Sequence, residues 1–162
     1  MQTVLFDNQG TFTTPTFTQS GVTISGSNSL QFLNLNGLGV TGGLDNTVVD
    51  RGEFLTFQFE GGAASNVSYG LQFAGNGNGD NTLGERKVEA FDINGNSLGS
   101  FNTSGLDGNV SASFGDRLIS GFQIQSIPGD NFRLNSVTFT REFIVDTLID
   151  ENDGDLRAGD VS

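Results

Sequence analysis

Carboxylates and amides are the side chains with the most evident capacity for chemistry in this chain, because the sequence contains no histidine and no cysteine. They are dense in one segment that carries Asp45, Asn46, Asp50 and Glu53 near a glycine turn. Ca²⁺ takes ~6 to 8 oxygen ligands, and a loop of closely spaced carboxylates and carbonyls readily brings such ligands together. The segment is therefore predicted to bind calcium. The alternative interpretation is a solvated turn in which aspartate side chains cap their own backbone.

A second group of oxygen ligands includes Asp80 and Glu85, in a stretch rich in asparagine and glycine. Glycines allow backbone carbonyls to turn toward a metal, so this stretch is predicted either to hold calcium or to form a long solvated loop. The acidic end of the chain, which includes Asp150 and Asp153, has the ligand density of a calcium loop but not the residue order of an EF-hand. A linker is the favoured interpretation of that end.

The residue types argue against an enzyme. Without histidine and cysteine the chain lacks the commonest general base, the imidazole metal ligands and the thiol nucleophile. Pairs of carboxylates can hydrolyse glycosides. A chain this acidic supplies such pairs by chance, so a glycoside hydrolase is only a remote alternative. The carboxylates in question are Glu53, Glu60, Glu85 and Glu89.

Charge and hydropathy restrict the partners. The chain has 7 Lys and Arg against 19 Asp and Glu, a net charge of −12. Such a field repels nucleic acid and anionic membranes, and no apolar run reaches the ~18 residues of a membrane-spanning helix. An acidic composition rich in glycine and asparagine is typical of soluble extracellular modules, where calcium is abundant. We therefore expect a secreted or cell-surface location, although the given chain begins without an export signal.

The elements that must position these side chains are β-strands. Apolar residues alternate with polar ones in several segments, a period of two that gives a strand one buried face. The clearest rows are Leu55/Phe57/Phe59, Val67/Tyr69/Leu71/Phe73, Leu118/Phe122/Ile124 and Val137/Phe139 after Leu134. We expect Leu55/Phe57/Phe59, Val67/Tyr69/Leu71/Phe73 and Val137/Phe139 to form the core. Further strands are expected near 3–6, 11–18, 22–24, 30–35, 87–93, 109–114 and 143–147. Helical periodicity is missing, and 24 glycines disfavour helices.

Turn signals divide the chain into many short strands. Asn36-Gly37 and Asn94-Gly95 supply the positive φ angles of tight hairpins, and Pro15 places its strand at an edge or a bend. Short strands with a turn about every ten residues favour an all-β, antiparallel, two-sheet β-sandwich of jelly-roll type. We expect residues 1–142 to form this domain and residues 143–162 to form a C-terminal strand with an acidic, linker-like tail.

Two parts of the sequence resemble known bacterial modules. The stretch GLGVTGGLDNTVVDRGEFLTFQF at 37–59, the hairpin AFDINGNSLGSF at 90–101 and the strand NFRLNSVTF at 131–139 resemble jelly-roll modules of exported bacterial surface proteins. Many such modules carry aspartate where this chain has Asn135. The stretch VDTLIDENDGDLRAGDVS at 145–162 resembles the segment that precedes β-helix or repeat regions in very large adhesins. The resemblance implies a module of a long surface protein with further domains on its C-terminal side.

These observations predict a non-enzymatic, calcium-stabilised structural or adhesive module of a bacterial surface or secreted protein. The alternative is a calcium-dependent carbohydrate-binding module. Neighbouring domains or copies of the surface protein rank slightly above glycan as partners, because the chain has no tryptophan and its one tyrosine, Tyr69, lies in an apolar row.

Overall fold

The computed structural model describes residues 1–43, 45–50, 52–73, 86–103, 108–111, 117–127 and 131–142. Asp80, Glu85 and the segment from residue 143 onward lie outside the described residues, as do the predictions made for them. Within the described ranges the chain forms eleven strands in one antiparallel sheet, and the only helix is the single 3-10 turn η1 (Glu60–Gly62). No helix in these ranges reaches the length and hydropathy that crossing a bilayer requires.

The strands include the segments in which apolar and polar residues alternate. Their bounds are β1 (Gln2–Leu5), β2 (Phe12–Gln19), β3 (Val22–Leu33), β4 (Gly37–Val40), β5 (Phe54–Phe59), β6 (Ala64–Phe73), β7 (Arg86–Phe91), β8 (Ser97–Thr103), β9 (Gly108–Ser111), β10 (Gly121–Ser126) and β11 (Phe132–Arg141). Both Asn-Gly pairs lie in hairpins, between β3 and β4 and between β7 and β8. Among the described strands β2 pairs only with β3, so Pro15 lies on an edge strand, beside a register shift between Thr14 and Thr16.

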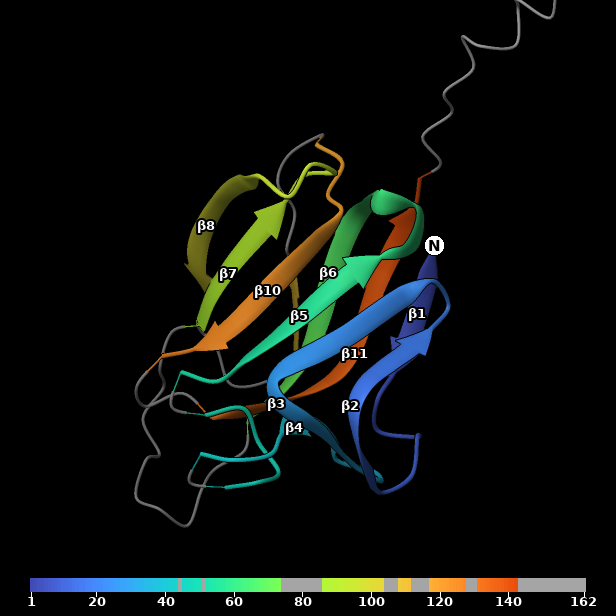
Figure 1. Cartoon of the computed structure of the whole chain (residues 1–162). Coiled ribbons are helices and arrows are strands. Elements are labelled where there is room, and N and C mark those ends of the chain that lie inside the picture. The colour runs from blue at the N-terminus through green and yellow to red at the C-terminus, as the bar shows by residue number, and fades with distance from the viewer. Residues whose placement is uncertain are drawn as a thin grey trace, which may run out of the picture.

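The sheet runs in the order β8-β7-β10-β5-β3-β4-β11-β6-β9, with β2 added to β3 and β1 added to β11. Strand β3 connects the two parts of the sheet, because its first half pairs with β5 and its second half pairs with β4. Strand β4 also pairs with β11, and β11 pairs with β6 and β1. The sheet curls so strongly that β6, β11 and β1 lie behind β5, β10 and β3 (Figure 1).

Aromatic contacts show that the concave face closes on itself. Phe59 of β5 lies 4.8 Å from Phe139 of β11, and Phe122 of β10 lies 6.2 Å from Tyr69 of β6, measured between ring centroids. Neither pair belongs to neighbouring strands. The core is therefore the space enclosed by one curled sheet.

The prediction of an all-β antiparallel fold is confirmed, but the structure does not show two separate sheets. The physical reason is the length of β3, whose 12 residues carry hydrogen bonds from one half of the fold to the other through β4. A sequence pattern reports which face of a strand is buried, and it does not report whether neighbouring strands stay hydrogen-bonded around a bend.

The predicted core rows are largely correct. Buried residues of the predicted rows include Leu55, Phe57 and Phe59 of β5, Val67, Tyr69 and Leu71 of β6, and Leu134, Val137 and Phe139 of β11. Phe57 is completely buried and stacked on Phe122 with 4.5 Å between ring centroids. The side chain of Phe73 lies outside the described part of the chain. Leu118 was predicted to share a row with Phe122, and this is wrong: it precedes β10 and is 44% exposed.

Candidate functional site

The predicted calcium segment is the connection between β4 and β5, residues 41–53, which we call the acidic loop. The loop is tied back onto the sheet, because Val49 forms an antiparallel bridge with Phe132 at the start of β11. Val48 also bonds to β4, its carbonyl accepting from the Val40 amide at 3.2 Å. Val48 and Val49 are buried, and the chain then carries Asp50 into the interior, where its side chain is completely buried. A carboxylate in this place exists only where partners offset its desolvation.

Asp50 and Glu53 form a closely coupled pair. The Asp50 amide donates to Glu53 Oε2 at 3.1 Å, and the Glu53 amide donates to the Asp50 carbonyl at 2.8 Å. Asp50 Oδ2 accepts from the Asp45 amide at 3.2 Å. The turn formed by these bonds holds two carboxylates on the same side of the loop.

Two glycines make room for the pair. Gly43 has φ +59°, and a Cβ atom there would collide with Asp50 Oδ1 and lie 3.2 Å from Glu53 Oε1. A Cβ at Gly42 would lie 3.1 Å from the same Glu53 oxygen. One oxygen of each carboxylate therefore faces the glycine turn, which only a residue without a side chain can form at this distance.

Electrostatics make the pair sensitive to protons and cations. The pKa of Glu53 is raised to about 7, mainly by burial; the hydrogen bond from the Asp50 amide lowers it, and the nearby Asp50 carboxylate raises it. At neutral pH Glu53 therefore holds a proton for much of the time. A cation could replace that proton, because it would neutralise both carboxylates at once.

Asp45 and Asn46 lie in the same loop but have another role. Asp45 Oδ1 accepts from the Thr47 amide at 2.9 Å and from the Thr47 hydroxyl at 2.6 Å, and Asn46 Oδ1 accepts from the Gly42 amide at 2.8 Å. In these contacts the side chains cap backbone amides of their own loop, as the alternative interpretation of a solvated turn predicts. The structure thus brings together Asp50 and Glu53, and it uses Asp45 and Asn46 to fold the loop around them.

Arg133 of β11 is a neighbour of the loop that the sequence did not single out. Its guanidinium donates from Nε to the Thr47 carbonyl at 3.0 Å and from Nη2 to the Thr47 hydroxyl at 2.9 Å. Burial lowers the pKa of Arg133, and Asp45 raises it. The only signal in the sequence was a lone arginine in the otherwise uncharged row NFRLNSVTF.

The acidic loop offers a metal ion two neighbouring carboxylates, those of Asp50 and Glu53. Within the described ranges, no three residues of the types His, Cys, Asp and Glu gather closely enough to hold a metal ion. Two carboxylates and nearby carbonyls fit a Ca²⁺ ion only if water completes the shell. Asp80 and Glu85 lie outside the described residues.

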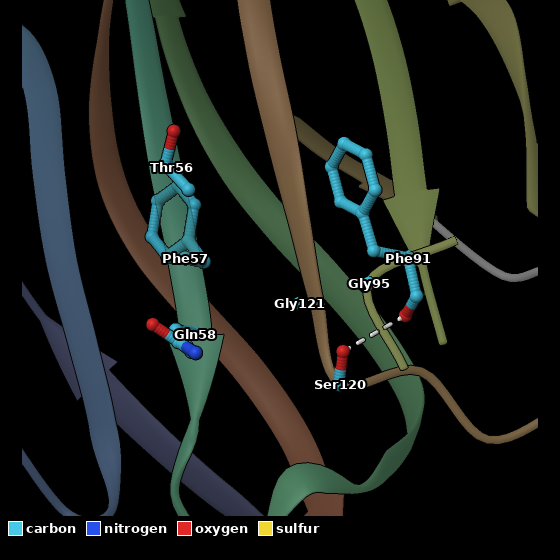
Figure 2. Close-up of a pocket in the computed structure, with 7 residues that line it drawn as sticks. All are labelled: Thr56, Phe57, Gln58, Phe91, Gly95, Ser120 and Gly121. Carbon is cyan, nitrogen blue, oxygen red and sulfur yellow. Dashed lines mark hydrogen bonds between the residues drawn. The ribbon is translucent and has the colours of Figure 1, made fainter. Parts of the chain in front are cut away.

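A separate hollow lies on the outer face of the sheet, and we call it the outer-face hollow (Figure 2). Its volume is about 220 Å³. Its lining comes from β5, from β10 with the residue before it, and from the end of β7 with its hairpin turn. The lining residues are Thr56, Phe57, Gln58, Phe91, Gly95, Ser120 and Gly121. The sequence did not indicate this site, because its members are far apart in the chain and none belongs to a chemical motif.

Comparison with known proteins does not assign the chain to a family. No protein-family model matches the sequence, and no curated protein matches it. The antiparallel curled sheet is shown by the structure, whereas the resemblance to surface-protein modules depends on short motifs alone.

Proposed function

We propose that this chain is a non-enzymatic structural or adhesive module of a bacterial surface or secreted protein, related to jelly-roll modules and stabilised by calcium. The proposal is supported by one arrangement: Asp50 is completely buried and lies beside Glu53, and the pKa of Glu53 is raised to about 7. In the absence of a cation, ionising Glu53 costs folding free energy. A calcium ion would convert that cost into a stabilising interaction.

The ligands that we assign to the ion are Asp50 and Glu53, with backbone carbonyls of the acidic loop and water as the remaining oxygens. Calcium tolerates such mixed shells, and magnesium demands a tighter octahedral one. The rest of the domain adds a general attraction, because its net charge is −12. Asp45 acts indirectly in this proposal by shaping the loop through Thr47.

The arrangement of the carboxylates supports a non-enzymatic role over a glycoside hydrolase. Glu53 has the raised pKa of a general acid, yet its partner Asp50 is completely buried and out of reach of a substrate. Glu60 lies 3.7 Å from Arg141 and Glu89 lies 3.8 Å from Lys87, both as surface ion pairs. None of these carboxylates lines the outer-face hollow.

Two edge strands, β2 and β8, have features that disfavour pairing with a second copy of the chain. Strand β2 carries Pro15 and a register shift, and β8 carries a register shift against β7. Both devices oppose pairing with a strand from another chain. We therefore propose neighbouring domains of the same surface protein as the principal contacts, rather than copies joined edge to edge through β2 or β8.

Thermal unfolding in calcium, magnesium or chelator tests the proposal. Calcium that binds only the folded state adds RT ln(1 + [L]/Kd), ~2.7 kcal/mol at a hundredfold excess over Kd. A domain of this size gains roughly 2 to 4 °C in Tm per kcal/mol, so a rise of about 5 to 10 °C is expected. Asp50→Asn should remove most of the rise, and magnesium should produce less of it. An identical Tm in calcium and chelator would contradict the proposal.

A further inference from the structure

The outer-face hollow exists because a glycine replaces a side chain in the middle of the sheet. Gly121 of β10 lies between Gln58 of β5 and Phe91 of β7 in the strand register. A Cβ at Gly121 would collide with the Phe57 carbonyl, so β5 and β10 lie too close for any other residue. The glycine forms the floor, with Gln58 and Thr56 on one side and Phe91 and Gly95 on the other (Figure 2).

The wall that carries Phe91 is held in place by a dense set of hydrogen bonds. Asp92 Oδ1 accepts from the amides of Asn94 and Asn96, each at 2.9 Å, and these bonds lower the pKa of Asp92. The Phe91 carbonyl accepts from the Ser120 amide at 2.8 Å and from the Ser120 hydroxyl at 3.2 Å. The hairpin is therefore preorganised, and a ligand in the hollow would not need to order it.

The lining has a definite chemical character. It contains one half-buried aromatic ring, Phe91, opposite the amide of Gln58 and the hydroxyl of Thr56. No lining residue is charged. An aromatic face attracts the C–H groups of a ligand, and amides and hydroxyls exchange hydrogen bonds with its hydroxyl groups. A sugar ring presents both kinds of group. An anionic ligand would find no cationic side chain in the lining and would be repelled by the net charge of −12.

The size of the hollow restricts the ligand further. Sites for drug-sized ligands enclose roughly 300 to 1,000 Å³. A hollow of about 220 Å³ holds something smaller, such as a single sugar ring. The outer face continues beyond it as a polar surface, where Gln123 donates from Nε2 to Thr56 Oγ1 at 3.2 Å. A longer saccharide could extend across this surface.

We propose that the outer-face hollow binds one ring of a neutral polysaccharide, with Phe91 against the face of the ring and with Gln58 and Thr56 bonding its hydroxyl groups. This inference deepens the adhesive role proposed above and needs no calcium. The hollow shares no residue with the acidic loop. One small ring in an open hollow binds in about the millimolar range, so a polymer that offers many rings is the appropriate probe.

Affinity electrophoresis tests the proposal. The full chain is run in native gels that contain hydroxyethylcellulose, galactomannan or soluble starch, each with chelator and with calcium, and in gels that contain anionic polygalacturonate. We expect slowed migration in at least one neutral polymer, to the same extent with calcium or chelator, and none in polygalacturonate. Phe91→Ala and Gln58→Ala should each weaken the retardation at least tenfold. Gln58 is exposed on the strand, so the second variant retains the fold if the first does not.

Ile93→Ala is the matched control. Ile93 is an apolar residue of the same hairpin, 57% exposed, and it lies outside the hollow beside Gly62. This variant should migrate as the wild type does. Migration unaffected by every neutral polymer, retardation that persists in both Phe91→Ala and Gln58→Ala, or retardation lost in chelator would each overturn the proposal. The calcium proposal is decided separately by the melting experiment.

Discussion

Replacing Glu53 by glutamine removes one charge from the buried pair and leaves its shape almost unchanged. Glutamine still offers an oxygen to the Asp50 amide, the bond that Glu53 Oε2 accepts at 3.1 Å. It stays neutral at every pH. The effect of Glu53→Gln on stability is therefore a measure of what ionising Glu53 costs the fold.

The direction of the pKa shift determines whether Glu53→Gln raises or lowers the free energy of unfolding. The pKa of Glu53 is raised from 4.5 to about 7, so the folded protein holds this proton more tightly than the unfolded chain does. The associated stability is fully present below pH 4.5 and is lost as the pH rises through about 7. The full shift corresponds to ~3 kcal/mol. Solvent screens this half-buried group, so we expect a loss on the order of 1 to 2 kcal/mol.

The assay is thermal unfolding followed by circular dichroism at pH 4.5 and pH 8.5, in chelator and in calcium. In chelator at pH 8.5 the variant should melt above the wild type by about 2 to 8 °C, and at pH 4.5 the two should agree. In calcium at pH 8.5 the order should reverse, because only the wild type retains both carboxylates for the ion. Glu60→Gln, at a side chain 72% exposed, is the control and should show neither effect. A variant that is less stable in chelator at pH 8.5 would refute the reasoning.

Three other outcomes are expected. Phe57→Ala should destabilise by ~3 to 5 kcal/mol in urea unfolding, because the ring is completely buried and stacked on Phe122, whereas Phe12→Ala on the edge strand should cost less than about 1.5 kcal/mol. Gly43→Ala should cost about 2 kcal/mol or more and should abolish the Tm rise in calcium, because its Cβ would collide with Asp50 Oδ1. A hydrolase screen on model glycosides and esters should find no activity above that of the Asp50→Asn variant, and activity that disappears in this variant would contradict the non-enzymatic role.

Much of the fold could be predicted from local patterns. Alternation in segments such as Leu55/Phe57/Phe59 identified buried strand faces, and Asn94-Gly95 identified a hairpin, because both signals are carried by neighbours in the chain. The path of the sheet could not be predicted, because it depends on how β3 divides its hydrogen bonds between β5 and β4. Leu118 was misassigned because an apolar residue just outside a strand has the same spacing as one inside it.

For the candidate sites too, some features could be predicted from local sequence patterns and others could not. Asp50 and Glu53 lie together because they are the first and last residues of a four-residue turn, and their spacing in the sequence reflects that turn. Spacing could not show that Asp45 turns onto Thr47, because capping and metal binding use the same oxygen atoms. The outer-face hollow depends on Gly121 lying between two strands that are distant in sequence. No pattern within one segment reports that kind of site.

The most direct test of the calcium proposal is the number of calcium ions bound per chain at pH 8.5, measured by equilibrium dialysis on the wild type and on Glu53→Gln. Comparing the two proteins isolates the acidic loop from any other carboxylates that bind calcium. The wild type should bind one more calcium ion per chain than the variant, because only the wild type has two ionised carboxylates in the acidic loop. Equal binding by the two proteins would contradict calcium stabilisation through Asp50 and Glu53.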